Sequence, residues 1–523
     1  MGSDPFYGEG RMEKNYTELF KRVANGNDVR GVVLATESEK VSLEPWMVVC
    51  IAQAFSDFLA EAGGKEKGTL RIGIGHDSRI TAPQMTKAAL AGLYQVKAFD
   101  CGLITTPAMF QSTVLEDSHF DGAIMITASH LPFNRNGMKF FTGEGAIGKA
   151  QLGDILQKAA AIAEAEPAME TDEASWADRR GEVQTFDMQN VYCSHMQDVI
   201  KKTVAADDYE HPLKGLHIVE DAGNGAAGFF AEKILAPLGA DISGSVFMDP
   251  DGSFPNHVPN PEDPAAMDAA RKAVLDAKAD LGVIFDCDGD RGAVVFSDGT
   301  EVNRNKLIAL LSVIVSEQSP GSAVVTDSVT SDELAEFLTE KLGMEHLRFK
   351  RGYKNVIDKG IELNKQGKVC ELAIETSGHG AFRENYFSDD GAYIAVKIIC
   401  KMAALLKENR RIEELIADLK NPAEAKEMRY HIQAEDFKAY GASVLDAFRN
   451  FCENQPGFRI VEPNYEGIRA AFNLDGADGW VLLRMSLHDP VLPMNIETKQ
   501  AGGVEIIRRK LDGFFRGFDA LKE

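Results

Sequence analysis

Three aspartates alternate with other residues in the segment 286–291 and could bind a metal ion: they are Asp286, Asp288 and Asp290. An apolar run typical of a buried strand comes directly before them, so we expect the aspartates on a loop at a strand's carboxyl end. Such carboxylates can converge on one hard cation, and Gly289 permits the tight turn that this requires. An EF-hand is excluded because a strand precedes the loop and Ser297 stands where the closing carboxylate should be. The pattern favours a magnesium site over a solvated acidic turn.

A second polar loop is expected after the strand 121–127, and it places a hydroxyl beside ionisable groups. Ser129 is followed by His130, and Lys139 comes ten residues later. These groups suit a serine hydroxyl that carries a charged group during a reaction. We expect the dipeptide 136–137, Asn-Gly, to reverse the chain and return Lys139 toward Ser129. By itself this pattern is weak, because a Ser-His dipeptide is usually part of an ordinary turn.

Two further loops, each expected after a strand, carry side chains that could bind a sugar phosphate. The first begins at Glu375, where a carboxylate and a neighbouring hydroxyl could hold adjacent sugar hydroxyls. The second supplies guanidinium, hydroxyl and imidazole donors that suit a phosphate dianion, from Arg484, Ser486 and His488. Each of the two, taken alone, could equally be an ordinary connection.

A glycine-rich segment, 223–228, has the G-x-G-x-x-G spacing of a dinucleotide site and lies between an expected strand and an expected helix. That fingerprint also needs an acidic residue at the end of the next strand. Asp241 instead begins the next apolar run, so the fingerprint is incomplete. We therefore expect these glycines to serve close packing between the strand and the helix 226–238.

The elements that must position these loops read as alternating strands and helices. With 523 residues the chain is too long for one hydrophobic core, which suggests three to four domains. Short apolar runs alternate with amphipathic runs, which predicts βαβ units whose ligands bind beyond the carboxyl ends of strands. Residues 430–523 are expected to form a smaller α+β unit. The acidic, alanine-rich segment 160–180 is expected to be a long helix or a surface insertion.

Composition and charge exclude several classes of protein. The net charge of −24 argues against a nucleic-acid partner, which would need a dense positive face. It also requires that any site for an anionic substrate be locally positive. No apolar run approaches the length of a membrane span, and no secretory leader is visible. Seven scattered cysteines without a C-x-x-C pair fit a reducing compartment, so we expect a cytoplasmic protein.

Taken in order, the four loops resemble the α-D-phosphohexomutase family, and its phosphomannomutase/phosphoglucomutase branch in particular. Further segments share the resemblance, which covers nearly the whole chain: 28–31, 75–79, 105–107, 251–257 and 389–393. The resemblance implies three related α/β domains with mixed sheets and a smaller C-terminal α+β domain around a central cleft. It implies domains at 1–194, 195–299, 300–425 and 426–523, which supply the phosphoserine, metal, sugar and phosphate loops respectively.

The resemblance also implies a phosphohexomutase, an intramolecular phosphotransferase that interconverts hexose 1-phosphate and hexose 6-phosphate. A phosphorylated Ser129 would act through a hexose 1,6-bisphosphate intermediate, which is also the expected activator. One phosphoserine oxygen would join the three aspartates around Mg²⁺. His130 and Lys139 would assist proton transfer, and Arg291 would steady the phosphoryl group. The implied substrate-binding residues are Arg30, Glu375, Ser377, His379, Arg484, Ser486 and His488.

The chain departs from the family's usual pattern in two of the loops. Leu487 and His488 stand where the phosphate loop usually has glycine or asparagine and then threonine, and Ile374 and Thr376 are unusual in the sugar loop. These changes bear on substrate choice more than on chemistry. The alternatives that remain open are a phosphoglucosamine mutase, and a degenerate mutase that binds a sugar phosphate as a regulator. The oligomeric state, monomer or homodimer, is not readable from the sequence.

Overall fold

The computed structural model describes residues 15–179, 181–486 and 489–523. The chain forms two compact units. Of the described residues, the first unit contains 15–76, 81–102, 119–179 and 181–186, and the second contains 77–80, 103–118, 187–486 and 489–523. Within the described residues, no helix is both long and apolar enough to cross a membrane.

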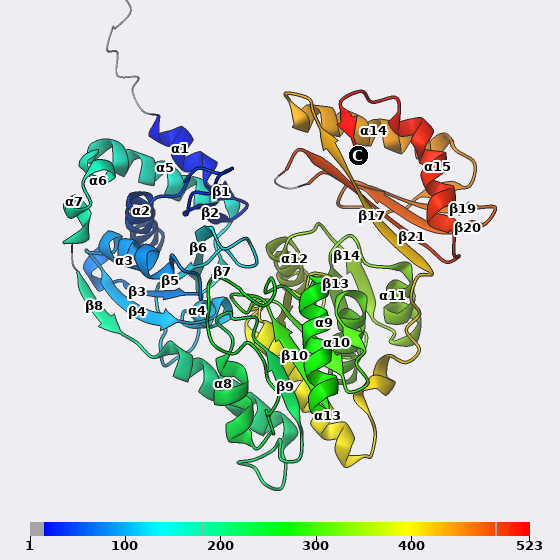
Figure 1. The fold of residues 1–523 in the computed structure, drawn as a ribbon, viewed down its shortest axis with the longest axis horizontal. Coiled ribbons are helices and arrows are strands. Elements are labelled where there is room, and N and C mark those ends of the chain that lie inside the picture. Colours follow the sequence, from blue (N-terminus) through cyan, green and yellow to red (C-terminus); the bar gives the residue numbers. More distant parts are fainter. Residues whose placement is uncertain (1–14, 180, 487–488) are drawn as a thin grey trace, which may run out of the picture. The chain divides into compact units, whose positions relative to one another are not determined.

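The first unit is built on one mixed sheet with the strand order β1-β2-β6-β5-β3-β4-β8, and β7 pairs with β6 (Figure 1). Strand β3 pairs in parallel with β5, whereas β6 runs antiparallel to both β5 and β2. Its strands are β1 (Ala24–Asn25), β2 (Asp28–Val32), β3 (Arg71–His76), β4 (Lys97–Leu103), β5 (Gly122–Ile126), β6 (Arg135–Thr142), β7 (Gly145–Ala146) and β8 (Glu182–Thr185).

Helices pack against this sheet through a continuous apolar core. Strand β5 is buried along its whole length, and α2 contributes Trp46, Ile51 and Phe55 to the core. The helices are α1 (Tyr16–Arg22), α2 (Pro45–Gly63), α3 (Ala82–Gly92), α5 (Lys149–Ala165), α6 (Ala168–Thr171) and α7 (Ala174–Ala177). Of the two alternatives expected for residues 160–180, a long helix or a surface insertion, the long helix is wrong. Helix α5 ends before Pro167, which disfavours helical geometry in the residue that precedes it, and two one-turn helices follow.

The second unit contains two four-stranded mixed sheets, β12-β11-β10-β9 and β14-β13-β15-β16. The strands are β9 (Ile218–Asp221), β10 (Leu281–Phe285), β11 (Gly292–Phe296), β12 (Glu301–Val302), β13 (Ala323–Thr326), β14 (Glu345–Arg348), β15 (Cys370–Ile374) and β16 (Gly380–Phe382). The α-helices of this part are α4 (Thr106–Gln111), α8 (Met188–Val204), α9 (Pro264–Ala277), α10 (Arg304–Gln318), α11 (Asp332–Glu336), α12 (Tyr353–Lys365) and α13 (Gly391–Lys407). Strands β10 and β15 are each followed by a loop and an antiparallel strand.

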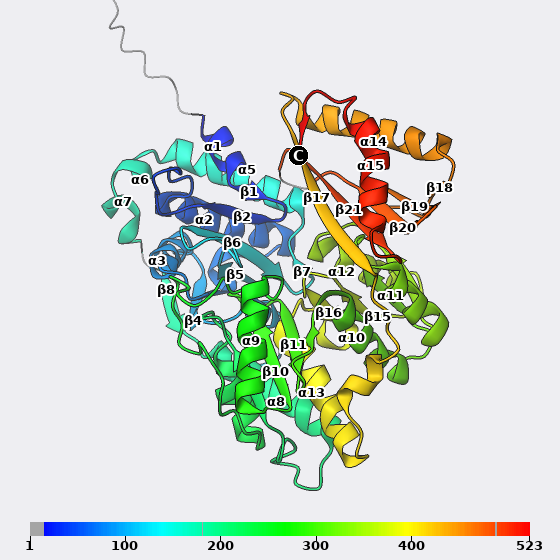
Figure 2. The same ribbon diagram turned by 45° about the vertical axis from the view of Figure 1, so that its right-hand side comes forward.

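The C-terminal part of the second unit is a separate sheet with the order β18-β19-β20-β21-β17-β22. Its elements are β17 (Glu424–Ile432), α14 (Phe437–Asn454), β18 (Phe458–Ile460), β19 (Ile468–Leu474), β20 (Ala477–Leu483), β21 (Val491–Thr498), α15 (Gly503–Phe515) and β22 (Leu521–Lys522). Figure 2 shows α14 and α15 on the same side of this sheet, where Phe448 and Leu511 join its core. The expected smaller α+β unit is confirmed.

The glycines of the segment 223–228 contact two loops, where packing between a strand and a helix was expected. The helix after it is short, with a π-helical turn at Phe230–Leu235 and a 3₁₀ turn at Ala236–Leu238. A Cβ atom on Gly225 would lie 2.7 Å from the carbonyl oxygen of Cys287, and one on Gly228 would lie 2.3 Å from that of Met248. These glycines therefore allow the chain to approach the backbone of the aspartate loop and of a neighbouring loop.

Candidate active site

The aspartate loop connects β10 to β11, whose last and first residues, Phe285 and Gly292, face each other across the antiparallel pair. Gly289 has φ of +71°, the left-handed conformation that closes this turn. Carboxylate oxygens of three aspartates lie within 4.8 Å of one another, and each residue is at most 1% exposed: Asp286, Asp288 and Asp290. The structure thus brings the three predicted ligands together, and a hard cation such as Mg²⁺ fits this donor set.

The electrostatics of the loop also fit a cation. Burial raises the pKa of Asp286 well above its usual value, and the charges of Asp290 and Asp288 raise it further. Thr106 fixes the loop from the start of α4: its Oγ1 donates to Asp288 Oδ2 at 2.6 Å, and its backbone N–H donates to the Asp288 carbonyl at 2.8 Å. Three carboxylates held this closely repel one another unless positive charge is bound among them.

The sugar loop, between β15 and β16, is hydrogen-bonded to the aspartate loop. Arg291 and His379 form an antiparallel backbone bridge, and the Gly292 N–H donates to the Gly378 carbonyl at 3.2 Å. A Cβ atom on Gly378 would lie 2.9 Å from the Gly292 carbonyl oxygen, so glycine is needed there. The two predicted loops are therefore in direct contact.

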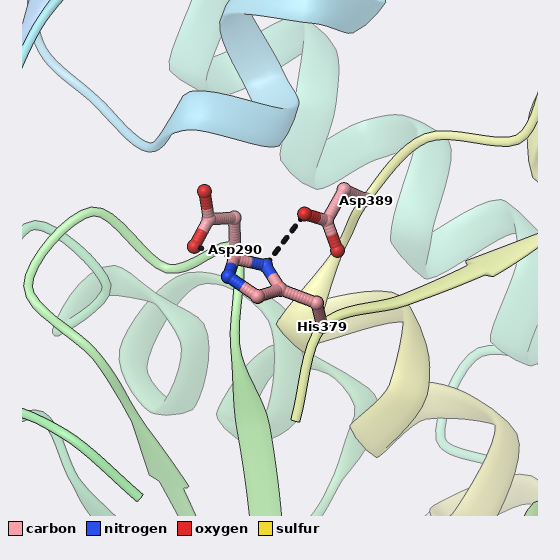
Figure 3. A group of neighbouring side chains, drawn as sticks. All are labelled: Asp290, His379 and Asp389. Carbon is pink, nitrogen blue, oxygen red and sulfur yellow. Dashed lines mark ion pairs between the residues drawn. The ribbon is translucent and has the colours of Figure 1, made fainter. Parts of the chain in front are cut away.

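His379 belongs to the sugar loop, and its side chain lies against the aspartate loop (Figure 3). Its Nδ1 is 2.6 Å from Asp389 and 3.6 Å from Asp290, and its Nε2 accepts a hydrogen bond from Arg291 Nε at 2.9 Å. That hydrogen bond places the imidazole proton on Nδ1, which faces Asp389. Asp290, His379 and Asp389 are close enough to hold a metal ion, but a protonated Nδ1 is no ligand. The geometry instead suits a histidine that orients Arg291.

The phosphoserine loop lies in the first unit, after β5. Ser129 is 6% exposed and has φ of +50°, and its N–H donates to Thr127 Oγ1 at 2.8 Å. Its Oγ is 3.2 Å from His130 Nδ1, so the structure brings these two predicted residues together. A hydroxyl held in a buried turn beside an imidazole is suited to accept and release a charged group.

The expected reversal at residues 136–137 is wrong, because both residues belong to strand β6. The chain reverses earlier, where the Leu131 N–H donates to the Ala128 carbonyl and the Arg135 N–H donates to that of Pro132. Gly137 has a different role. A Cβ atom there would lie 2.0 Å from the Val29 carbonyl oxygen, so the glycine permits close strand pairing.

Two predicted cations lie on β2 and β6, neighbouring strands of the sheet that carries the phosphoserine loop. Lys139 is 3% exposed on β6, opposite Met125 of β5. Arg30 donates from Nη1 to the Thr127 carbonyl, and its Nη2 pairs with Asp28 at 2.9 Å. Arg30 is thus held against the loop that carries the serine, whereas Lys139 is buried on β6.

Glu375 is buried at the start of the sugar loop. Its Oε1 accepts the Gly352 N–H at 2.6 Å, and its Oε2 is 3.5 Å from Ser377 Oγ. Burial, reinforced by the charge of Asp327, raises the pKa of Glu375 to about 7, although His379 nearby opposes the shift. Thr376, which follows, donates from Oγ1 to Asp327 at 2.7 Å. The unusual threonine is therefore used to fix the loop.

The raised pKa of Glu375 predicts a stability that depends on pH. The unfolded chain releases this proton near the ordinary value of 4.5, and the folded chain releases it only near 7. Between these values the folded state binds more protons, so the free energy of unfolding falls as pH rises. As pH rises from 5 to 7.5, we expect the melting temperature of Glu375→Gln to increase relative to that of the wild type by about 2 °C or more. A difference in melting temperature that stays constant over this range would contradict the shift.

The phosphate loop follows β20 in the C-terminal sheet. Arg484 is 7% exposed, and burial lowers its pKa from the usual value although Glu466 opposes this. The Ser486 N–H donates to the Val491 carbonyl at 2.9 Å, and its Oγ accepts the Asp489 N–H at 3.2 Å. His488, predicted to bind phosphate, lies outside the described residues. The loop thus presents a guanidinium beside a hydroxyl.

Several residues that contact the site lie outside the four predicted loops. Thr106 and Asp389 lie in segments that shared the family resemblance, so their signal was present without an assigned role. Arg351 and Glu262 belong to no motif in the sequence. Each reaches the site only through tertiary contacts. Glu262 lies 3.7 Å from Arg291, and Arg351 lies 3.5 Å from the buried Asp327.

Comparison with known proteins places this architecture in one family. Residues 21–166, 190–299 and 303–422 match the models described as Phosphoglucomutase/phosphomannomutase, alpha/beta/alpha domains I, II and III. A phosphoglucomutase of Neisseria gonorrhoeae is 27% identical, covering 92% of this chain and 94% of that protein. A phosphomannomutase/phosphoglucomutase of Pseudomonas putida is also 27% identical, covering 84% and 86%. The solved structure of a phosphoglucomutase/phosphomannomutase family protein from Burkholderia thailandensis has a TM-score of 0.72 at 24% identity and covers 95% of this chain and 97% of its own.

The chain therefore belongs to the phosphoglucomutase/phosphomannomutase family, the α-D-phosphohexomutases. Membership makes it an enzyme of the isomerase class, an intramolecular phosphotransferase, as the sequence predicted. The expected fold class is confirmed as well, with three α/β/α domains, mixed sheets and a separate sheet-rich C-terminal domain.

Proposed function

We propose that this phosphohexomutase interconverts the 1- and 6-phosphates of glucose and mannose. The observation that carries the proposal is the buried aspartate trio, hydrogen-bonded through its loop to a second loop that carries Glu375. Phosphoryl transfer needs charge stabilisation beside a site that orients the acceptor, and these joined loops supply both. Relatives named for glucose and for mannose phosphates support this choice of hexose.

We assign the residue roles as the resemblance implies. Phosphorylated Ser129 donates its phosphoryl group to the free hydroxyl of the hexose phosphate, and His130 and Lys139 move the proton of that hydroxyl. The resulting hexose 1,6-bisphosphate reorients, and its other phosphoryl group returns to Ser129. Arg291, oriented by His379, stabilises the transferred phosphoryl group. The sugar hydroxyls are read by Glu375 and Ser377, and the other phosphate is held by Arg484, Ser486 and His488, with Arg30 beside the serine loop.

The metal ligands in this proposal are the three carboxylates, together with one oxygen of phosphorylated Ser129. Bound there, Mg²⁺ supplies positive charge that offsets the charge of the phosphoryl group. Hexose 1,6-bisphosphate is the proposed activator, because it would restore the phosphoserine whenever the intermediate escapes. We also propose a cytoplasmic location and the four-domain division with boundaries after residues 194, 299 and 425.

A coupled assay tests the function directly. The purified protein is given glucose 1-phosphate, mannose 1-phosphate or glucosamine 1-phosphate, with Mg²⁺ and a trace of hexose 1,6-bisphosphate. We expect turnover of the first two substrates at kcat values of about 1–10³ s⁻¹. Preferred turnover of glucosamine 1-phosphate would instead identify a phosphoglucosamine mutase. Binding without turnover of any of the three would identify a sugar-phosphate-binding regulator.

Ser129 is expected to carry phosphate after incubation with hexose 1,6-bisphosphate. The serine hydroxyl beside His130 is the proposed acceptor, and a phosphate ester adds a fixed mass to the chain. Intact-mass spectrometry should show one added phosphate, and peptide mapping should place it on Ser129. Phosphate found on another residue, or no added mass, would refute the assignment.

A further inference from the structure

Glu262 lies among three arginine side chains of the second unit. Its carboxylate oxygens are 3.7 Å from Arg291 Nη1, 3.8 Å from Arg351 Nη2 and 4.0 Å from Arg304 Nη2. All three separations exceed the length of a charge-assisted hydrogen bond, about 2.8 Å. Arg291 and Arg351 each approach one further carboxylate, Asp286 at 3.7 Å and Asp327 at 3.5 Å, and these separations are also longer than a hydrogen bond. A guanidinium group has five N–H donors, so these arginines can still donate to a further anion, within a chain whose net charge is −24.

Arg351 lies between the sugar loop and the phosphate loop. The backbone N–H of the residue after it is the donor that binds Glu375, and its own N–H donates to Glu466 Oε2 at 3.1 Å. Gly467, the residue after Glu466, lies against Arg484, since a Cβ atom on Gly467 would be 2.7 Å from Arg484 Cα. In keeping with this geometry, Glu466 opposes the lowering of the pKa of Arg484 and Arg351 adds to it. Two guanidinium groups, one from each loop region, therefore share one electrostatic neighbourhood.

The side chain of Arg351 borders a cavity of about 490 Å³ in the second unit. Thr376 of the sugar loop and Glu262 line the same cavity, as do Glu427 and Arg429 of β17. Four basic side chains line it against three acidic ones, so the cavity has the local positive charge that a phosphate ester requires. Arg351 is 24% exposed, which leaves its guanidinium accessible from this side.

We propose that Arg351 binds the phosphate of the hexose phosphate that is not being transferred, together with Arg484. The inference rests on the proposed function, since it assumes a hexose phosphate in the site. A phosphate dianion has enough acceptor oxygens to take hydrogen bonds from two planar guanidinium groups. Arg291, which serves the transferred phosphoryl group, lies on the other side of the same Glu262 carboxylate. A hexose with a phosphate at each end can therefore engage Arg291 and Arg351 at once.

The test compares Arg351→Gln and Arg351→Lys with a control, Arg509→Gln. Arg509 is an arginine of α15 that is 76% exposed, pairs with Glu505 at 2.9 Å and does not line this cavity. We expect Arg351→Gln to raise KM for glucose 1-phosphate and mannose 1-phosphate about tenfold or more, with kcat changed less than about threefold. Arg351→Lys should recover part of the loss, and Arg509→Gln should stay within about twofold of the wild type.

Inhibition by inorganic phosphate separates phosphate binding from a purely structural role. If Arg351 binds phosphate, the inhibition constant of inorganic phosphate should rise in Arg351→Gln in proportion to KM. A raised KM with an unchanged inhibition constant would overturn the proposal, because Arg351 would then act only through Glu375. Unchanged KM in an active enzyme would also overturn it while the proposed function stands. A wild type inactive on every hexose phosphate would refute the function itself, and this inference with it.

Discussion

Replacing Ser129 with alanine is expected to lower kcat by about 10⁴-fold or more while the protein stays folded. The proposed reaction passes through an ester on the Ser129 hydroxyl, and removing such a nucleophile leaves only positioning and charge stabilisation. The fold should tolerate the change. Alanine keeps the backbone N–H that donates to Thr127 Oγ1, and it is no more strained than serine at φ of +50°. The coupled assay measures kcat, and thermal melting checks the fold.

The matched control for this variant is Thr142→Ala, which removes a hydroxyl at the end of β6 on the same sheet. The Thr142 hydroxyl accepts the Glu144 N–H at 3.2 Å and has no place in the proposed reaction. We expect its kcat to stay within about threefold of the wild type. Ser129→Ala should also gain no mass from hexose 1,6-bisphosphate. Retained turnover in Ser129→Ala would show that phosphoryl transfer does not use this hydroxyl.

Asp288→Asn is expected to lose activity by about 10²-fold or more and yet to raise the melting temperature of the metal-free protein. The introduced asparagine would keep an oxygen that can accept from Thr106, so the connection to α4 can survive. The substitution removes one of three buried carboxylates; burial, and then the charges of Asp290 and Asp288, raise the pKa of Asp286. Stability and function therefore oppose each other at this loop, as they often do in strained active sites.

Melting curves with and without Mg²⁺ test both halves of that prediction. In the wild type, Mg²⁺ should raise the melting temperature and a chelator should lower it, because the cation binds only the folded loop. In Asp288→Asn, Mg²⁺ should raise the melting temperature by less than in the wild type, and the melting temperature of the metal-free protein should be higher. The control is Asp298→Asn, an exposed carboxylate in the turn after β11, which should respond to Mg²⁺ as the wild type does. An undiminished Mg²⁺ response in Asp288→Asn would remove Asp288 from the ligand set.

The sequence predicts a site well where the residues of that site are close together in the chain. The aspartate loop spans six residues after an apolar strand, so spacing alone placed its carboxylates together. The prediction was wrong where the turn propensity of a short segment competed with burial of a strand. The Asn-Gly pair at 136–137 is a common turn signal, but here it lies inside a buried strand, and Gly137 is needed for contact with Val29. The turn propensity of two residues is small beside the pairing of a whole strand.

Contacts between elements far apart in the chain were outside the reach of sequence patterns. Glu262, Arg304 and Arg351 come from three separate segments and share no periodicity, so nothing in their spacing predicts that they meet. The same holds for His379. Its sequence neighbours suggested a sugar-binding role, and only the bridge to Arg291 shows that it also supports the metal loop. In both cases, contacts between segments far apart in the sequence determine which residues meet.

The backbone bridge between Arg291 and His379 limits how substrate preference can be re-engineered. The segments 286–292 and 375–380 are cross-linked by main-chain hydrogen bonds, and glycine at 378 is required by the neighbouring chain. If only the sugar loop were replaced by that of a relative, the new backbone would have to form hydrogen bonds with the native aspartate loop. A chimera that exchanges both segments together preserves their mutual fit. The natural module for transplanting specificity in this enzyme is therefore the pair of loops, although they lie far apart in the gene.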